Sequence, residues 1–279
     1  MSTFNRDASQ ADLVEAFERD GYLVIEGALD RAEAERYRRR ILSLLPEDLT
    51  LPSWWESRFG RIKPLHEDGG QTYDQPELLP IFQNEAMYDV VRRILRSDEL
   101  RVFDGSIGIT LRHDRGESPL SQRIHTDHSI PTDVDRFRDD LSELELGGCF
   151  YLTDVEPQGG GISLLPGGHR VVMEQGGAPG GRQLHSNWTD IKGLPDLVEI
   201  TGRAGDFVLL HPLMPHAASH NRRETTRVVQ FLRWVRMDYP HGRAERPRSG
   251  KYSDEQLAVL TPLGRRLLGV DPWHTAVGA

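Results

Sequence analysis

Arg123-Ile124-His125-Thr126-Asp127-His128 is the stretch on which the interpretation of this sequence depends. In an extended segment, side chains two residues apart share one face and lie roughly 6 to 7 Å apart. His125 and Asp127 can therefore approach one ion while Thr126 points away. With one distant histidine they would form the two-histidine, one-carboxylate set that binds iron(II) and leaves three adjacent coordination positions open. In a chain with 11 His and 43 Asp plus Glu, the tripeptide His125-Thr126-Asp127 can occur by chance, so the metal site needs support from the rest of the sequence.

Length and composition indicate one soluble domain spanning residues 1–279. The formal net charge of −9 argues against a nucleic-acid partner. Cys149 is the single cysteine, which excludes an internal disulfide, and its apolar neighbours predict a small buried residue. No apolar stretch approaches the roughly 20 residues that span a bilayer, and the first residues do not form a signal region. We expect a cytoplasmic monomer or homodimer without membrane contact.

Residues 1–99 are predicted to form a mostly helical layer with a loop. Ser9 starts a short helix that ends at Gly21, Tyr22 to Ile25 is a strand, and Asp30 opens a second helix. Residues 46–80 lose periodicity and carry two tryptophans, which suggests a loop over the site. Ala86 to Leu95 returns to a helical pattern.

Strands dominate residues 100–236, so the fold is predicted to be mainly β with flanking helices. The expected strands are Leu100–Phe103, Ile107–Leu111, the His125 segment, Cys149–Leu152, Glu199–Thr201, Asp206–Leu210 and Arg227–Val235. Residues 171–198 read as a lid insertion and Pro212 to Arg223 as a polar connection. In the tail, residues 237–279, Ser253 and Gln256 predict a capped helix on the outside of the core.

Two histidines, His211 and His216, compete for the third ligand position, because both follow the apolar run 207–210. If the open positions hold a keto acid, its far carboxylate needs a fixed arginine that can bind it through two hydrogen bonds. Arg227 starts a strand whose one face continues to Arg233 and can point into a barrel. Spacing alone also permits His211 with Arg222, since both pairs are eleven residues apart.

With these residues, the sequence resembles the phytanoyl-CoA dioxygenase family of iron(II)/2-oxoglutarate oxygenases over most of its length. The matching segments are Phe17 to Gly27, His125-Thr-Asp127, Thr153-Asp154 with the glycines at 159–161, Leu165 to Arg170, and Ala204 to His216 with Asn221 and Arg227. The resemblance implies a double-stranded β-helix, or cupin-like jelly roll. It also implies iron(II) held by His125, Asp127 and His216, which form the catalytic site, with 2-oxoglutarate held by Arg227 and dioxygen as the other co-substrate.

The expected reaction follows from the same resemblance. 2-Oxoglutarate is converted to succinate and carbon dioxide, and an unactivated C–H bond of a small molecule is oxidised, most simply by hydroxylation. Related halogenases replace the carboxylate ligand with a small residue, so the presence of Asp127 argues against halogenation. The substrate would be an acidic compound or an intermediate of secondary metabolism.

Four residues are candidate substrate contacts. They are Arg112, Gln122, Trp188 and Arg233. Several arginines near the mouth of a pocket would suit a carboxylate or phosphate, although neighbouring acids could pair with them instead. A second reading stays open, in which the chain is a metal-binding cupin-like barrel that acts as an isomerase, hydrolase or sensor.

Overall fold

The computed structural model describes residues 2–5, 8–44, 61–62, 74–112, 124–127, 141–176, 197–240 and 252–274. The strands are β1 (Thr3–Asn5), β2 (Tyr22–Glu26), β3 (Arg61–Ile62), β4 (Leu100–Thr110), β5 (Leu146–Tyr151), β6 (Ile162–Leu164), β7 (Val198–Ile200), β8 (Phe207–Leu210), β9 (His216–Ala218) and β10 (Arg227–Arg236). The helices are α1 (Gln10–Asp20), α2 (Arg31–Ser43), α5 (Glu85–Leu95), α7 (Gly168–Gly176), α8 (Asp254–Ala258) and α9 (Pro262–Leu267), with short 3-10 turns η1 (Leu79–Gln83) and η3 (Leu141–Glu143).

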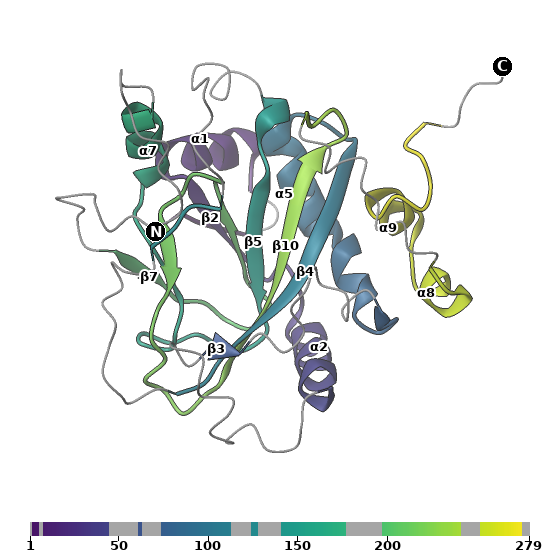
Figure 1. Ribbon diagram of the computed structural model, residues 1–279, viewed down its shortest axis with the longest axis horizontal. Coiled ribbons are helices and arrows are strands. Elements are labelled where there is room, and N and C mark those ends of the chain that lie inside the picture. Colours follow the sequence, from purple (N-terminus) through teal and green to yellow (C-terminus); the bar gives the residue numbers. More distant parts are fainter. Residues whose placement is uncertain are drawn as a thin grey trace.

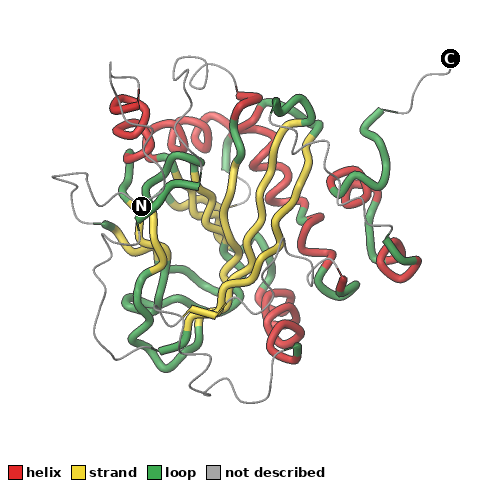
Figure 2. Tube along the Cα trace, in the orientation of Figure 1, coloured by secondary structure: helices red, strands yellow, loops and turns green. Residues whose placement is uncertain are grey.

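The described strands form two sheets (Figures 1 and 2). The large sheet has the order β1-β2-β8-β5-β10-β4-β3, and the small sheet has the order β7-β6-β9. Apart from the parallel pair β1 and β2, the strand pairs are antiparallel. The mainly β fold with flanking helices is therefore confirmed.

Strand β2 shows how the layers pack, because it is buried on both faces. Leu23 and Ile25 belong to an apolar cluster with residues of α1, α2 and α5. Tyr22 and Val24 belong to a second cluster that joins the large sheet to the small one. The molecule thus has a helical layer, a large sheet and a small sheet, and the space between the sheets is the candidate site.

Helix ends follow the local signals of the sequence. Ser9 caps α1, which ends at Gly21 in the left-handed conformation with φ 72°. Asp30 caps α2, and Ser253 with Gln256 forms the expected capping box of α8. These side chains satisfy backbone N–H groups that have no partner within their helices.

Strand β4 differs from the sequence prediction of two separate strands. It is one strand with a β-bulge. Gln230 of β10 pairs with Ile107 and Leu232 pairs with Asp104, so a step of two residues along β10 matches a step of three along β4. Asp104 (φ 80°) and Gly105 (φ 81°) adopt left-handed conformations there. The extra residue shifts the alternation of apolar side chains, which is why the pattern looked like a break.

Three other segments differ from expectation. The lid predicted at 171–198 begins within α7, and its middle lies outside the described residues, as do most of residues 46–80. The supposed polar connection 212–223 contains β9. His125 lies in an isolated bridge rather than in a strand. Short strands of this kind depend on distant partners, so local periodicity does not reveal them.

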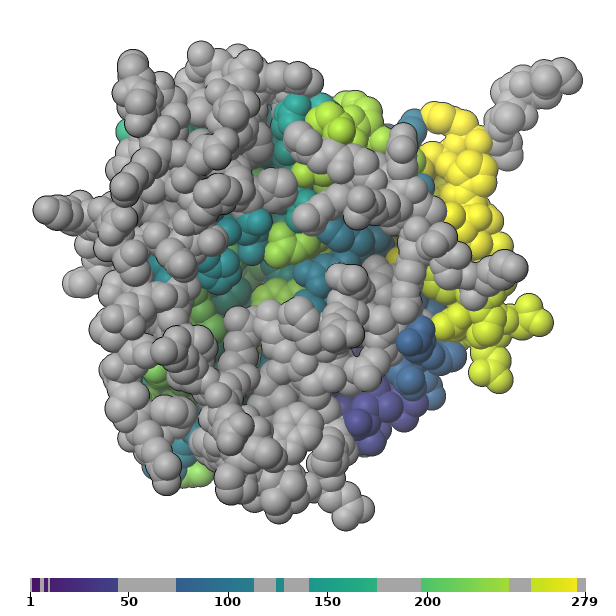
Figure 3. Space-filling model, in the orientation of Figure 1, coloured from purple at the N-terminus to yellow at the C-terminus, as the bar shows by residue number. Residues whose placement is uncertain are grey.

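The face of the large sheet turned away from α1 and α5 is the one seen in Figures 1 to 3. In the space-filling view, atoms of β4, β5 and β10 lie at the bottom of a hollow (Figure 3). Among the described residues, no helix is long and apolar enough to cross a membrane.

Candidate metal centre

Two histidines that are 91 positions apart in the chain are joined by backbone hydrogen bonds. The His125 N–H donates to the His216 carbonyl, and the His216 N–H donates to the His125 carbonyl, each at 2.9 Å. Residues paired in this way direct their side chains to the same side, and the two imidazole centroids are 4.4 Å apart. Strand β9, which starts at His216, is held in turn by β6.

Asp127 adds a carboxylate to this pair. Its Oδ1 atom lies 4.0 Å from His125 Nε2 and 3.9 Å from His216 Nε2. One ligand atom from each residue lies within 4.8 Å of the others, and among the described residues this is the group that could hold a metal ion. The donor set of two imidazoles and one carboxylate matches the facial triad of non-haem iron sites.

The environment favours the protonation states that bind a metal. The His216 Nδ1–H donates to the Met214 carbonyl over 2.9 Å, which leaves the Nε2 lone pair directed at the group. Burial lowers the pKa of His216 to about 4, against the opposing charge of Asp127. Burial also opposes ionisation of Asp127, but neighbouring positive charge, chiefly that of Arg233, outweighs it and holds its pKa below the ordinary value. A neutral imidazole and an ionised carboxylate result.

The competing histidine, His211, lies in a different environment. Its ring packs against Phe17, at 5.9 Å between centroids, and against His169, at 4.8 Å. Its Nδ1 accepts a hydrogen bond from the Leu213 N–H at 3.1 Å. The structure therefore places His216, and not His211, beside His125 and Asp127.

Arg227 starts β10 and is 1% exposed. None of its three guanidinium nitrogens has a hydrogen-bond partner among the described residues, and the guanidinium lies 5.4 Å from the centre of the Tyr151 ring. Thr110, its neighbour on β4, has a buried hydroxyl that likewise lacks a partner in the described part of the chain. A buried cation without a counter-charge costs several kcal/mol, so this position fits a bound carboxylate. Sequence reasoning missed Thr110, since threonine is common in strands.

The four predicted substrate contacts have different outcomes. Arg112 forms an ion pair with Glu224. Arg233 forms ion pairs with three carboxylates, one of which is Asp127. Gln122 and Trp188 lie outside the described residues.

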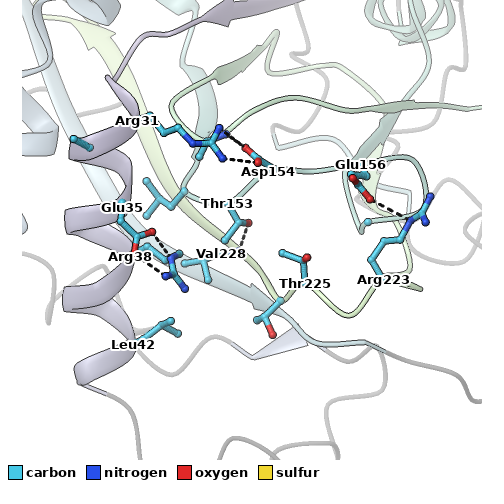
Figure 4. Close-up of a pocket in the computed structure, with 15 residues that line it drawn as sticks. Arg31, Glu35, Arg38, Leu42, Thr153, Asp154, Glu156, Arg223, Thr225 and Val228 are labelled. Atoms are coloured by element: carbon cyan, nitrogen blue, oxygen red, sulfur yellow. Dashed lines mark hydrogen bonds and ion pairs between the residues drawn. The ribbon is translucent and has the colours of Figure 1, made fainter.

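A separate cavity of about 960 Å³ lies between α2 and the turns that follow β5 and precede β10 (Figure 4). Its lining arginines pair with acids: Arg31 of α2 with Asp154 at 2.6 Å, Arg38 with Glu35 of the same helix at 2.7 Å, and Arg223 with Glu156 at 3.8 Å. None of the three candidate metal ligands lines it. This cavity is therefore distinct from the candidate metal centre.

A two-sheet β fold with two histidines and an aspartate between its sheets is the arrangement of a non-haem iron oxygenase. The family model described as "Phytanoyl-CoA dioxygenase (PhyH)" matches residues 17–229, and the chain belongs to this family. The family uses iron(II), 2-oxoglutarate and dioxygen, so the cofactors expected from the sequence are those of the family. No curated protein matches the chain.

Solved structures with the same fold include three proteins that bind or depend on alpha-ketoglutarate (2-oxoglutarate). The epimerase SnoN, in complex with Fe3+, alpha-ketoglutarate and nogalamycin RO, is 18% identical with a TM-score of 0.58, covering 81% of this chain and 83% of that one. The alpha-ketoglutarate-dependent carbocyclase SnoK from nogalamycin biosynthesis is 19% identical with a TM-score of 0.58, covering 85% and 88%. HygX from Streptomyces hygroscopicus, with nickel and 2-oxoglutarate bound, is 19% identical with a TM-score of 0.55, covering 82% and 88%. At these identities the likeness concerns the fold.

Proposed function

We propose that the chain is an iron(II)/2-oxoglutarate-dependent dioxygenase that hydroxylates a C–H bond of a small molecule. The observation that carries this proposal is the buried guanidinium of Arg227, which has no partner among the described residues. It accompanies the group of His125, Asp127 and His216. A metal group alone would fit many reactions, whereas a metal group with a prepared carboxylate site fits a keto-acid co-substrate.

Each residue has a distinct role in this proposal. His125, Asp127 and His216 would hold iron(II) through Nε2, Oδ1 and Nε2 respectively. Arg227 would bind the 5-carboxylate of 2-oxoglutarate, and the Thr110 hydroxyl beside it can donate a further hydrogen bond. Iron(II) held there would supply, with 2-oxoglutarate and dioxygen, the oxidising chemistry for hydroxylating a substrate C–H bond while 2-oxoglutarate is converted to succinate and carbon dioxide. The chain determines which C–H bond is presented.

Hydroxylation is the simplest outcome of this chemistry. SnoN is an epimerase and SnoK is a carbocyclase, so this fold also supports reactions that add no hydroxyl group. Both belong to nogalamycin biosynthesis, which suggests a natural-product substrate for this chain as well.

The acidity of the substrate has less support. Arg112 and Arg233, which suggested an acidic compound, are both engaged in ion pairs. A salt-bridged guanidinium has fewer donors for a ligand than an unpaired one. The proposal therefore concerns a small molecule whose charge the described arginines do not specify.

The alternative is a metal-binding barrel that acts as an isomerase, hydrolase or sensor. Such a protein would have no keto acid to bind, and the buried Arg227 would then destabilise the fold with no ligand to offset the cost. The unpartnered arginine therefore favours the oxygenase.

Anaerobic titration of the Fe(II)-loaded protein with 2-oxoglutarate tests the proposal. A bidentate keto-acid chelate should give a weak visible charge-transfer band, and that band should be lost in Arg227→Ala. Arg222→Ala is the matched control, because Arg222 is the competing arginine of the sequence. Metal binding without a band in the unsubstituted protein would contradict the oxygenase.

A further inference from the structure

Arg233 lies on the inner face of β10 between two strands that leave room for its side chain. Its neighbours across the sheet are Phe103 on β4 and Gly147 on β5. A Cβ atom added at Gly147 would lie 3.5 Å from Asp127 Oδ2 and 3.6 Å from Arg233 Nη1. These are ordinary van der Waals distances, so Gly147 borders the place where the guanidinium and the carboxylate meet.

Three nitrogens of Arg233 each contact a different carboxylate. Nε donates to Asp104 Oδ2 at 3.1 Å, and Nη1 donates to Glu145 Oε1 at 3.0 Å. Nη2 lies 3.1 Å from Asp127 Oδ1. The guanidinium is planar, so fixing Nε and Nη1 also fixes the direction of Nη2.

Asp104 is itself held in place by the bulge of β4. It adopts φ 80°, and its Oδ1 accepts hydrogen bonds from the Ser106 N–H at 3.0 Å and the Ser106 hydroxyl at 2.6 Å. A left-handed conformation is unfavourable in a residue other than glycine. The bulge directs the other oxygen, Oδ2, to Arg233.

We propose that Arg233 is a positioning residue for the metal: held by Asp104 and Glu145, it fixes the orientation of the Asp127 carboxylate. The oxygen that receives its hydrogen bond, Oδ1, is also the one nearest both histidine Nε2 atoms. A carboxylate oxygen has two lone pairs, so one accepts from Nη2 while the other remains for the ion. This inference rests on the proposed metal site and gives Arg233 a role different from substrate binding.

Arg233→Lys is the variant that tests this role, because lysine keeps the positive charge and loses the planar fork. Loss of a residue that orients a metal ligand typically lowers metal affinity about 10- to 100-fold. Co2+ titration measures the affinity, and the visible spectrum of the saturated protein reports the coordination geometry. We expect weaker binding and a changed spectrum in Arg233→Lys.

Arg101→Lys is the matched control. Arg101 is also a buried arginine of this sheet, on the adjacent strand β4, but its Nη1 donates to the Arg266 carbonyl in the C-terminal segment, at 2.7 Å. This variant should bind Co2+ as the unsubstituted protein does. If Arg233→Lys does not fold, Asp104→Asn keeps Arg233 and weakens only its anchor, with an expected loss of about 3- to 10-fold, less than the loss typical of a direct ligand partner.

The outcomes separate the two proposals. If the unsubstituted protein binds no Co2+, the proposed function fails. If the unsubstituted protein binds Co2+ and Arg233→Lys has the same affinity and spectrum, the positioning role is overturned, because Arg233 then only neutralises buried acids. Where the lysine variant does not fold, the same result with Asp104→Asn overturns it. Equal losses in Arg233→Lys and Arg101→Lys would also overturn it, because the effect would then be a general one on the fold.

Discussion

Arg227→Met should change apo stability and co-substrate binding in opposite directions. The arginine is 1% exposed, and its guanidinium has no hydrogen-bond partner in the described part of the chain. An uncompensated buried charge costs about 3 to 5 kcal/mol, and its contact with the Tyr151 ring returns about 2 kcal/mol. Methionine fills a similar volume without the charge. The apo variant should therefore be more stable by roughly 2 kcal/mol, or about 4 °C in Tm for a chain of this size.

The same substitution should remove the carboxylate site. Two hydrogen bonds from a charged donor contribute about 1.5 to 3 kcal/mol each, so their loss should raise the Kd for 2-oxoglutarate by about 140- to 20,000-fold. With metal bound, 2-oxoglutarate at about 100 times its Kd should stabilise the unsubstituted protein by about 2.7 kcal/mol and leave Arg227→Met unchanged. Thermal unfolding with and without the ligand measures both effects.

Arg222→Met serves as the control, because Arg222 is the other arginine eleven residues beyond a candidate histidine and is less buried than Arg227. It should change neither apo stability nor ligand binding by much. A lower apo Tm in Arg227→Met together with an unchanged Kd for 2-oxoglutarate would refute the reasoning, since Arg227 would then have a structural partner.

Three further outcomes follow from the site and its surroundings. Alanine at His125 or His216 should abolish Co2+ binding, whereas His211→Ala should retain it; the opposite result at the two distal histidines, measured by titration, would overturn the ligand assignment. Chelation should lower the stability of the metal-loaded protein by about 2.7 kcal/mol if free metal had been about 100 times its Kd, and scanning calorimetry with a chelator measures this. Acid should destabilise the apo protein, because burial lowers the pKa of His169 from 6.5 to about 4, so between these values the unfolded chain binds a proton that the folded chain does not. His169→Leu should reduce the stability that is lost between about pH 7 and about pH 4.5 by up to about 3 kcal/mol. Urea unfolding of both proteins at these two pH values measures the loss, and an equal loss in the variant would mean that His169 does not contribute to it.

Local chemistry explains why part of the fold was predictable. Caps at Ser9, Asp30 and Ser253 mark helix starts, because a side-chain oxygen must satisfy N–H groups within three residues. The spacing of His125 and Asp127 is also a local signal, because two candidate ligands on one short segment can be recognised without information about the rest of the chain.

The remainder of the site depends on contacts between distant segments. The bridge between His125 and His216 joins positions 91 residues apart, and nothing in either local sequence specifies the pairing. At Asp104 the sequence pattern predicts a gap between strands, because the added residue of the bulge reverses the alternation of buried side chains. Long-range pairing therefore decides where the ligands meet.

Arg227 and Arg233 show most clearly what sequence could not separate. They lie on one face of one strand, so the pleat alone assigns both to the interior. Their surroundings differ: Arg233 meets three carboxylates that come from β4, the segment containing Asp127, and the residue before β5, whereas Arg227 meets none among the described residues. A buried cation that is paired with carboxylates can fix the orientation of those groups, whereas a buried cation without a counter-charge can bind an anion. The strand therefore carries one arginine suited to arranging the metal ligand and another suited to binding the co-substrate.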